Sequence, residues 1–127
     1  MQVEFILYVA DQQRSRDLYA FLLDRPPVLD VPGMTEFDLG SCKLGLMPED
    51  SIARIITPAL PHPTNASGVP RCELYLLLDD MTSYIARAEA SSLRIVDPAR
   101  DRDWRHRVAY FSDPDGHVIA FAQPIPA

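Results

Sequence analysis

The sequence has no excess of basic residues and no long hydrophobic run. It holds 12 Lys and Arg against 18 Asp and Glu, a formal net charge of −6, so it lacks the positive field that binds phosphate backbones or anionic lipids. The first apolar run, residues 3–9, is too short to span a bilayer and follows no basic segment typical of a signal peptide. We therefore expect a cytoplasmic protein with neither a nucleic-acid nor a membrane partner.

Cysteine and histidine are also scarce. Cys42 and Cys72 lie far apart without CxxC spacing, which favours reduced thiols. No Ser-His-Asp pattern, phosphate-binding loop or dinucleotide fingerprint is present, so nucleophilic hydrolysis and nucleotide chemistry have no support. The remaining composition is ordinary for a globular protein, at 47% hydrophobic and 24% charged residues. With 127 residues, the chain is expected to form a single soluble domain over 1–127.

The first half of the chain predicts a strand, a helix and a hairpin. Residues 3–9 alternate as in a strand, and Asp11 can cap the helical pattern that follows. Pro26 and Pro27 end this helix, because proline cannot donate in the helical ladder. Three further strands are expected, the last two joined by a tight turn at Gly40 and Ser41, over residues 28–31, 35–39 and 42–47.

The second half repeats this order after a proline-rich segment. Five prolines between residues 48 and 70 predict a crossover linker without a central element. Asp80 can cap a second helical pattern that runs to Ser92. Strands are expected over residues 73–78, 93–96, 108–111 and 117–122, the last two joined by a type I turn that ends at a left-handed glycine.

The two halves align with one constant shift. Glu4 falls on Glu73 and Asp11 on Asp80, each 69 residues apart, and a helical pattern follows each pair. Repeated units usually pack together because neither copy buries its apolar face alone. The sequence therefore predicts module 1 over about 1–48, a linker over 48–70 and module 2 over about 71–127.

The closing segment carries a recognisable motif. Residues 104–107 read Trp-Arg-His-Arg, followed by Tyr110-Phe111 and by Asp-Pro-Asp-Gly-His-Val-Ile at 113–119. This segment resembles the end of vicinal oxygen chelate proteins, a superfamily that includes glyoxalase I, bleomycin resistance proteins and extradiol dioxygenases, with Arg105 standing where glycine is usual. The resemblance implies an α+β fold of two βαβββ modules that form a curved mixed sheet around a cleft, often completed in a homodimer.

The resemblance also implies a metal site, which here is incomplete. It places ligands on the first strand of each module, at Glu4 and Glu73, the two candidate metal-binding and catalytic residues. On the last strand of each module the family places a glutamate, but this sequence has Gly45 among apolar residues and Ala120. We therefore assign no cofactor, and any ion held by the two glutamates would be a divalent metal such as Mn, Fe, Ni, Zn or Mg.

Without an ion, the two glutamates have other uses. If Glu4 and Glu73 face each other in a partly apolar cleft, like charges would raise one pKa and leave a shared proton. Such a pair could act as a general base or hold a cationic ligand. The alternative is that both are solvated, or paired with Arg71 or Arg107.

Ligand-binding candidates come from aromatic and basic residues near the implied cleft, namely Tyr8, Tyr75, Trp104 and Arg107. An aromatic stack or an anion clamp is conceivable at Trp104, although ordinary packing and a solvated loop explain such residues as well. His62 and His117 match no ligand position and receive no role, and we expect His117 to point outward.

Two functions follow. The first is a small-molecule-binding protein of the glyoxalase/bleomycin resistance type with an incomplete metal site. The alternative is a divalent-metal-dependent lyase, isomerase or dioxygenase that uses Glu4 and Glu73 as ligands. A domain kept only for dimerisation is a third possibility. The sequence leaves the ligand, and whether the protein is an enzyme, open.

Overall fold

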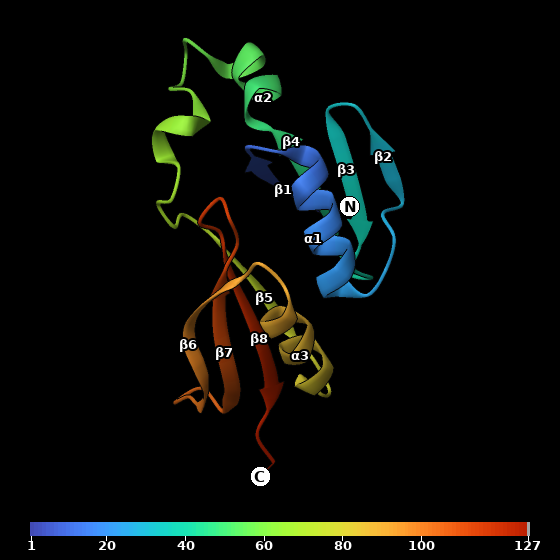
Figure 1. The fold of residues 1–127 in the computed structure, drawn as a ribbon, viewed down its shortest axis with the longest axis vertical. Coiled ribbons are helices and arrows are strands. Elements are labelled where there is room, and N and C mark those ends of the chain that lie inside the picture. Colours follow the sequence, from blue (N-terminus) through green and yellow to red (C-terminus); the bar gives the residue numbers. More distant parts are fainter. Residues whose placement is uncertain (127) are drawn as a thin grey trace. The chain divides into compact units, whose positions relative to one another are not determined.

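The computed structural model describes residues 1–126, which form two compact units. Unit 1 covers Met1–Ser67, and unit 2 begins at Gly68 (Figure 1). The elements of unit 1 are β1 (Glu4–Val9), α1 (Gln12–Leu23), β2 (Leu29–Val31), β3 (Met34–Asp38), β4 (Lys43–Pro48), α2 (Glu49–Ile56) and the 3-10 helix η1 (Pro63–Ala66). Those of unit 2 are β5 (Glu73–Leu77), α3 (Thr82–Ala90), β6 (Arg94–Asp101), β7 (His106–Ser112) and β8 (Val118–Pro124).

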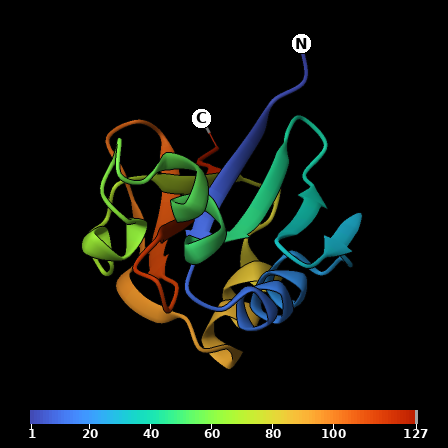
Figure 2. The ribbon, with the colours of Figure 1, turned by 90° about the horizontal axis from the view of Figure 1, so that it is seen from above.

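Unit 1 is a mixed sheet with the strand order β1-β4-β3-β2. The strands β1 and β4 run parallel, while the β3–β4 and β2–β3 pairs are antiparallel. The hairpin between β3 and β4 turns at Gly40, whose φ of 93° is one that glycine adopts without steric cost. Helix α1 packs against β3 and β4, on one side of the sheet (Figure 2).

Helix α1 forms where the sequence predicts it. The side chain of Asp11 accepts a hydrogen bond from the backbone N–H of Arg14, which satisfies one of the donors left open at a helix start. The apolar residues at helical spacing turn toward the sheet, and Tyr19 and Leu22 are almost fully buried. The helix ends at Leu23, three residues before Pro26, the first proline of the pair.

Unit 2 repeats the topology of unit 1. Its strand order is β5-β8-β7-β6, again with one parallel pair, β5 and β8, and two antiparallel pairs. The register repeats as well, because Glu4 pairs with Lys43 at the start of one parallel ladder and Glu73 with Val118 at the start of the other. The structure therefore confirms two βαβββ modules in an α+β fold.

The proline-rich segment differs from the prediction, which placed no regular element there. Helix α2 occupies Glu49–Ile56 and η1 occupies Pro63–Ala66. Prolines at 48 and 58 stand outside α2 rather than within it, so nothing interrupts its hydrogen-bond ladder. The acidic residues Glu49 and Asp50 in its first turn and Arg54 in its last turn also suit the helix dipole.

The other boundaries move by a few residues. Strand β6 extends to Asp101, well past the predicted end at 96, although its pairing with β7 shifts register between Ile95 and Asp97 and again between Asp97 and Arg100. Helix α3 ends at Ala90, before Ser92, and Asp80 accepts a hydrogen bond from the N–H of Thr82 at its start. Within residues 1–126 no helix is both long and apolar enough to cross a membrane.

Candidate functional site

Each sheet has one face covered by a helix and a second face turned away from it, which we call the far face. In unit 1 the near face meets α1, where Leu44 and Leu46 are buried. In unit 2 the ring of Tyr84 on α3 contacts Phe121 on β8, which marks the near face. Because side chains alternate along a strand, the residues that the sequence singles out on β1 and β5 lie on the far faces.

On the far face of unit 1, the carboxyl of Glu4 lies beside Glu36 and Gly45. A Cβ added to Gly45 would lie 2.8 Å from Oε2 of Glu4 and 3.3 Å from the sulfur of Met34. A side chain at position 45 would therefore displace the Glu4 carboxyl from its place beside the strand. Gly45 pairs with Ile6 on one side and Glu36 on the other. The pairing register of β1, β4 and β3 therefore determines which residues surround the Glu4 carboxyl.

Glu36 is the acidic partner that the sequence analysis missed. A hydrogen bond with the Glu36 side chain, then burial, then the Glu36 charge raise the pKa of Glu4 above its ordinary value, while Lys43 partly opposes the shift. The Nζ of Lys43 lies 3.9 Å from Glu36. Within unit 1, Glu4 thus belongs to a pair of carboxyls with one nearby cation. The pairing of Glu4 with Glu73 stays a prediction.

On the far face of unit 2, two tyrosines flank Ala120. Tyr75 on β5 and Tyr110 on β7 both pair with Ala120 across the sheet. They pack against the fully buried Val108, Ala120 and Ala122. The pKa of Tyr110 is raised by burial first and by the charge of Glu73 second. Glu73 therefore lies within electrostatic reach of this aromatic face.

The hydroxyl of Tyr75 contacts two polar side-chain groups, those of Trp104 and His106. It accepts a hydrogen bond from Nε1 of Trp104 at 2.9 Å and lies 2.6 Å from Nδ1 of His106. The rings of Tyr75 and His106 are 5.9 Å apart, centroid to centroid. Two of the predicted ligand-binding residues, Tyr75 and Trp104, are thus brought together, with His106 as a third member that we had not assigned.

The other two predicted ligand-binding residues lie elsewhere. Tyr8 is on the far face of unit 1, partly exposed, on the same strand as Glu4. The Nε of Arg107 donates to Asp101 at 2.8 Å, so this guanidinium pairs with Asp101 rather than with a glutamate. By strand alternation Arg107 also points away from the far face on which Tyr110 lies. The structure does not bring Arg107 together with Tyr75 and Trp104.

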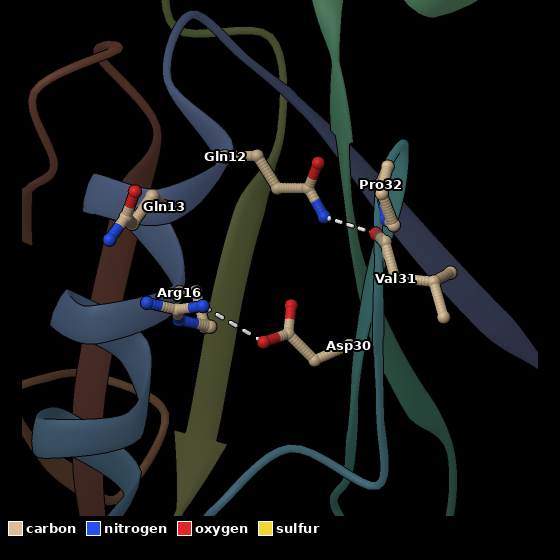
Figure 3. Close-up of a pocket in the computed structure, with 6 residues that line it drawn as sticks. All are labelled: Gln12, Gln13, Arg16, Asp30, Val31 and Pro32. Atoms are coloured by element: carbon tan, nitrogen blue, oxygen red, sulfur yellow. Dashed lines mark hydrogen bonds and ion pairs between the residues drawn. The ribbon is translucent and has the colours of Figure 1, made fainter.

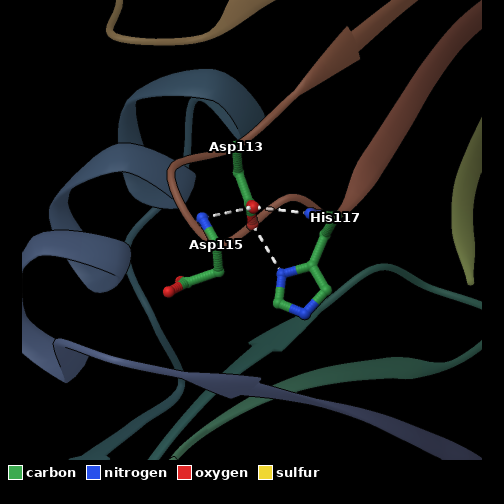
Figure 4. Close-up of side chains that lie close together, drawn as sticks. All are labelled: Asp113, Asp115 and His117. Atoms are coloured by element: carbon green, nitrogen blue, oxygen red, sulfur yellow. Dashed lines mark hydrogen bonds and ion pairs between the residues drawn. The ribbon is translucent and has the colours of Figure 1, made fainter. Parts of the chain in front are cut away.

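Three potential ligand groups gather in the turn between β7 and β8. Oxygen and nitrogen atoms of Asp113, Asp115 and His117 lie within 4.8 Å of one another (Figure 4). Oδ1 of Asp113 accepts from the backbone N–H groups of Asp115 and His117, and its Oδ2 lies 2.8 Å from Nδ1 of His117. These bonds are those of a tight Asp-Pro-Asp-Gly turn, so turn geometry accounts for the cluster.

The side chain of His117 is only 18% exposed. The expectation that it points outward is therefore wrong. Its hydrogen bond to Asp113 explains the difference, because the carboxylate and the turn backbone hold the imidazole against the protein.

A cavity of about 300 Å³ lies in unit 1 between the start of α1 and β2, lined by Gln12, Gln13, Arg16, Asp30, Val31 and Pro32 (Figure 3). Its polar groups are largely occupied with one another. The Gln12 amide donates to the carbonyl of Val31 and accepts from the N–H of Gly33. Arg16 bonds to Asp30 at 2.9 Å, which lowers the pKa of that carboxyl. We interpret these contacts as structural bracing of β2 against α1.

The donor set does not fit a complete metal centre of the kind that the resemblance implies. Gly45 and Ala120, at the two last-strand positions, occupy equivalent places in the two sheets, since one pairs with Ile6 and the other with Tyr75. Neither offers a ligand atom. Ala120 is also fully buried between two tyrosines. Glu4 and Glu73 are the remaining first-strand donors.

The pairing of βαβββ modules is the fold of glyoxalase-like proteins. A glyoxalase/bleomycin resistance protein/dioxygenase family enzyme from Burkholderia phytofirmans aligns with a TM-score of 0.82 at 12% identity, over 96% of this chain and 97% of that one. A glyoxalase-related enzyme from Fulvimarina pelagi gives 0.81 at 19%, covering 100% and 93%. A lactoylglutathione lyase from Agrobacterium tumefaciens gives 0.73 at 20%, covering 97% and 92%.

The sequence itself identifies the family. Residues 2–126 match the model of the glyoxalase-like domain, so the chain belongs to that family. No relative among curated proteins matches the sequence.

Proposed function

We propose that the protein binds a small organic molecule at the far face of unit 2, without a resident metal ion. One observation carries this proposal: the family's last-strand ligand positions are Gly45 and Ala120, while the face beside Ala120 presents the hydroxyl of Tyr75 and the half-exposed indole of Trp104. Aromatic surface with a few oriented polar groups is typical of small-molecule sites. The bleomycin resistance type of glyoxalase-like protein fits this description.

The competing function is a metal-dependent lyase, isomerase or dioxygenase. It is supported by the likeness of the fold to a lactoylglutathione lyase and by the pair of first-strand glutamates, Glu4 and Glu73. In this function the glutamates would be ligands or general bases, and the ion would be divalent. The two functions differ in whether an organic ligand still binds when no metal is present.

A combined metal and ligand experiment separates them. Untagged protein is analysed for metals, then screened by thermal shift against small organic molecules, with and without a chelator. Ligands that bind the native state raise the melting temperature by mass action. We expect stabilising ligands whose effect survives the chelator. Equimolar bound metal, together with ligand binding that the chelator abolishes, would instead favour the metal-dependent enzyme.

Matched variants then locate the site. Trp104→Ala should reduce the ligand-induced shift, whereas Trp104→Phe should keep part of it, because stacking needs a ring. Phe21→Ala removes an aromatic ring of similar exposure from α1 in unit 1 and serves as the control. Equal loss of the shift in Trp104→Ala and Phe21→Ala would place the ligand elsewhere. The homodimer stays a prediction, which gel filtration tests.

A further inference from the structure

Arg105 holds a backbone conformation that its residue type disfavours. Its φ is 70°, in the left-handed region where a Cβ crowds the backbone and glycine does not. Within residues 1–126 the other non-glycine residue at positive φ is Asp24, which ends α1 and is of a type that tolerates this region. Strained residues gather at ligand clamps and active sites, so an arginine in this conformation points to a use for its side chain.

The surrounding segment is basic in an otherwise acidic chain. Residues 100–107 contain four arginines against two aspartates, while the whole chain has a net charge of −6. Three of these arginines are engaged: Arg100 and Arg102 with Asp97, and Arg107 with Asp101. Arg105 is exposed, and its guanidinium makes no ion pair or hydrogen bond with the residues that the structure describes. It is the cation of this segment that remains open to an incoming anion.

The next residue offers a second donor. The N–H of Trp104 donates to the oxygen of Tyr75, and the same hydroxyl lies 2.6 Å from Nδ1 of His106, to which the phenol can donate its own proton. In that arrangement the ring proton of His106 is on Nε2. That atom has no partner within residues 1–126. Trp104 fixes the Tyr75 hydroxyl, and when that hydroxyl donates to Nδ1 of His106, the N–H at Nε2 is free for a ligand.

We propose that Arg105 and His106, braced by Tyr75 and Trp104, bind an oxyanion of the small organic ligand, a carboxylate or a phosphate monoester. A planar guanidinium and an imidazole N–H are suited to the oxygens of such a group. This inference rests on the proposed function and narrows it to anionic ligands, in contrast to the cationic ligand that a pair of glutamates could hold.

Trp104 makes the site easy to observe, because it is the single tryptophan of the chain. Its fluorescence and its indole N–H resonance report on this loop alone. The probes are benzoate and phenyl phosphate, with neutral benzyl alcohol as the control of similar size. We expect saturable changes with one or both anions and none with the alcohol at the same concentration. The anion that binds more tightly distinguishes a carboxylate site from a phosphate site.

Arg105→Gly separates the two roles of this residue. Glycine relieves the backbone strain, so the variant should melt at or above the wild-type temperature, yet bind the preferred anion about fivefold more weakly or worse. Arg100→Gln removes the same charge from a neighbouring residue that is already paired with Asp97, and should bind as wild type. His106→Ala should also weaken binding, and His106→Gln, which keeps an N–H donor, should recover part of it.

The proposal is wrong if benzyl alcohol changes the Trp104 signal as much as the anions do, if neither anion binds, or if Arg105→Gly keeps the wild-type affinity. In each of these cases, neutral ligands found by the thermal-shift screen would leave the proposed function standing. Failure to find any organic ligand would overturn both.

Discussion

A glycine in the turn between β7 and β8 is required for close packing, and its replacement gives a quantitative test of the fold. Gly116 has a φ of 89°. A Cβ added there would lie 2.7 Å from Cα and 3.0 Å from the carbonyl carbon of Gly68. Both atoms belong to the backbone and cannot rotate away, and a hydrogen bond from the N–H of Gly68 to the carbonyl of Asp115 holds the two segments together.

Gly40 is the matched control. Its φ of 93° is nearly the same, but a Cβ added there would meet nothing within 4 Å. Gly40→Ala should therefore cost only the left-handed backbone conformation, about 1 kcal/mol. Gly116→Ala should cost that amount plus the overpacking against Gly68, which adds about 1–3 kcal/mol. The expected total for Gly116→Ala is roughly 2–4 kcal/mol.

Urea unfolding of the two variants measures the difference. Far-UV circular dichroism follows the whole chain and Trp104 fluorescence follows unit 2, so both probes are recorded. A loss for Gly116→Ala that exceeds the loss for Gly40→Ala by at least about 1 kcal/mol supports the close approach. Equal losses would refute it, because the backbone conformation alone would then account for the glycine.

Two further substitutions test the far faces. Glu4→Gln should stabilise the protein at neutral pH by less than about 1 kcal/mol, since the pair with Glu36 is partly solvated. The pKa of Glu4 is raised in the folded state. The stability that Glu4 contributes is therefore present below the ordinary pKa of 4.5 and is lost as pH rises through the raised pKa. The melting-temperature difference between variant and wild type should thus grow from acidic to neutral pH, and a constant difference would contradict the pairing. Tyr75→Phe should cost about 0.5–1.5 kcal/mol in urea unfolding, because Trp104 and His106 lose a shared partner, and should shift Trp104 emission; an unchanged emission maximum would argue against the bond.

The sequence predicted the elements that depend on local pattern. Asp11 and the apolar spacing after it were enough for α1, and the small residues at Gly40 were enough for the hairpin. Helix α2 was missed because the prolines around it were counted together, when the stretch from 49 to 57 contains none. A proline breaks a helix only where it stands inside it. The positions of the prolines therefore allow a helix in this stretch, although their number suggested that there was none.

The partners of the site residues depend on strand register, which the sequence did not specify. Glu36 could be placed beside Glu4 only by combining the β3–β4 hairpin with the parallel pairing of β1 and β4, which puts Ile6, Gly45 and Glu36 in one row. The same holds for His106, which meets Tyr75 from another strand. The available signal was the alternation of polar residues at 36 and 38 along a strand. This alternation cannot identify the partners on neighbouring strands unless the strand register is known.

The duplication explains why the scaffold was easier to predict than the chemistry. Equivalent rows of the two far faces read Ile6, Gly45 and Glu36 in unit 1, and Tyr75, Ala120 and Tyr110 in unit 2. The central residue is small in both rows, and neighbours from two strands flank it.

The flanking residues of these rows differ: in unit 1 Glu36 lies beside Glu4, and in unit 2 two tyrosines form an aromatic face next to a basic loop. The two modules share their strand order and pairing pattern, whereas the side chains of their far faces differ. We therefore expect the ligand to be recognised by features that the modules do not share, and Arg105 is the clearest of these, because its backbone conformation would be satisfied at lower cost by glycine.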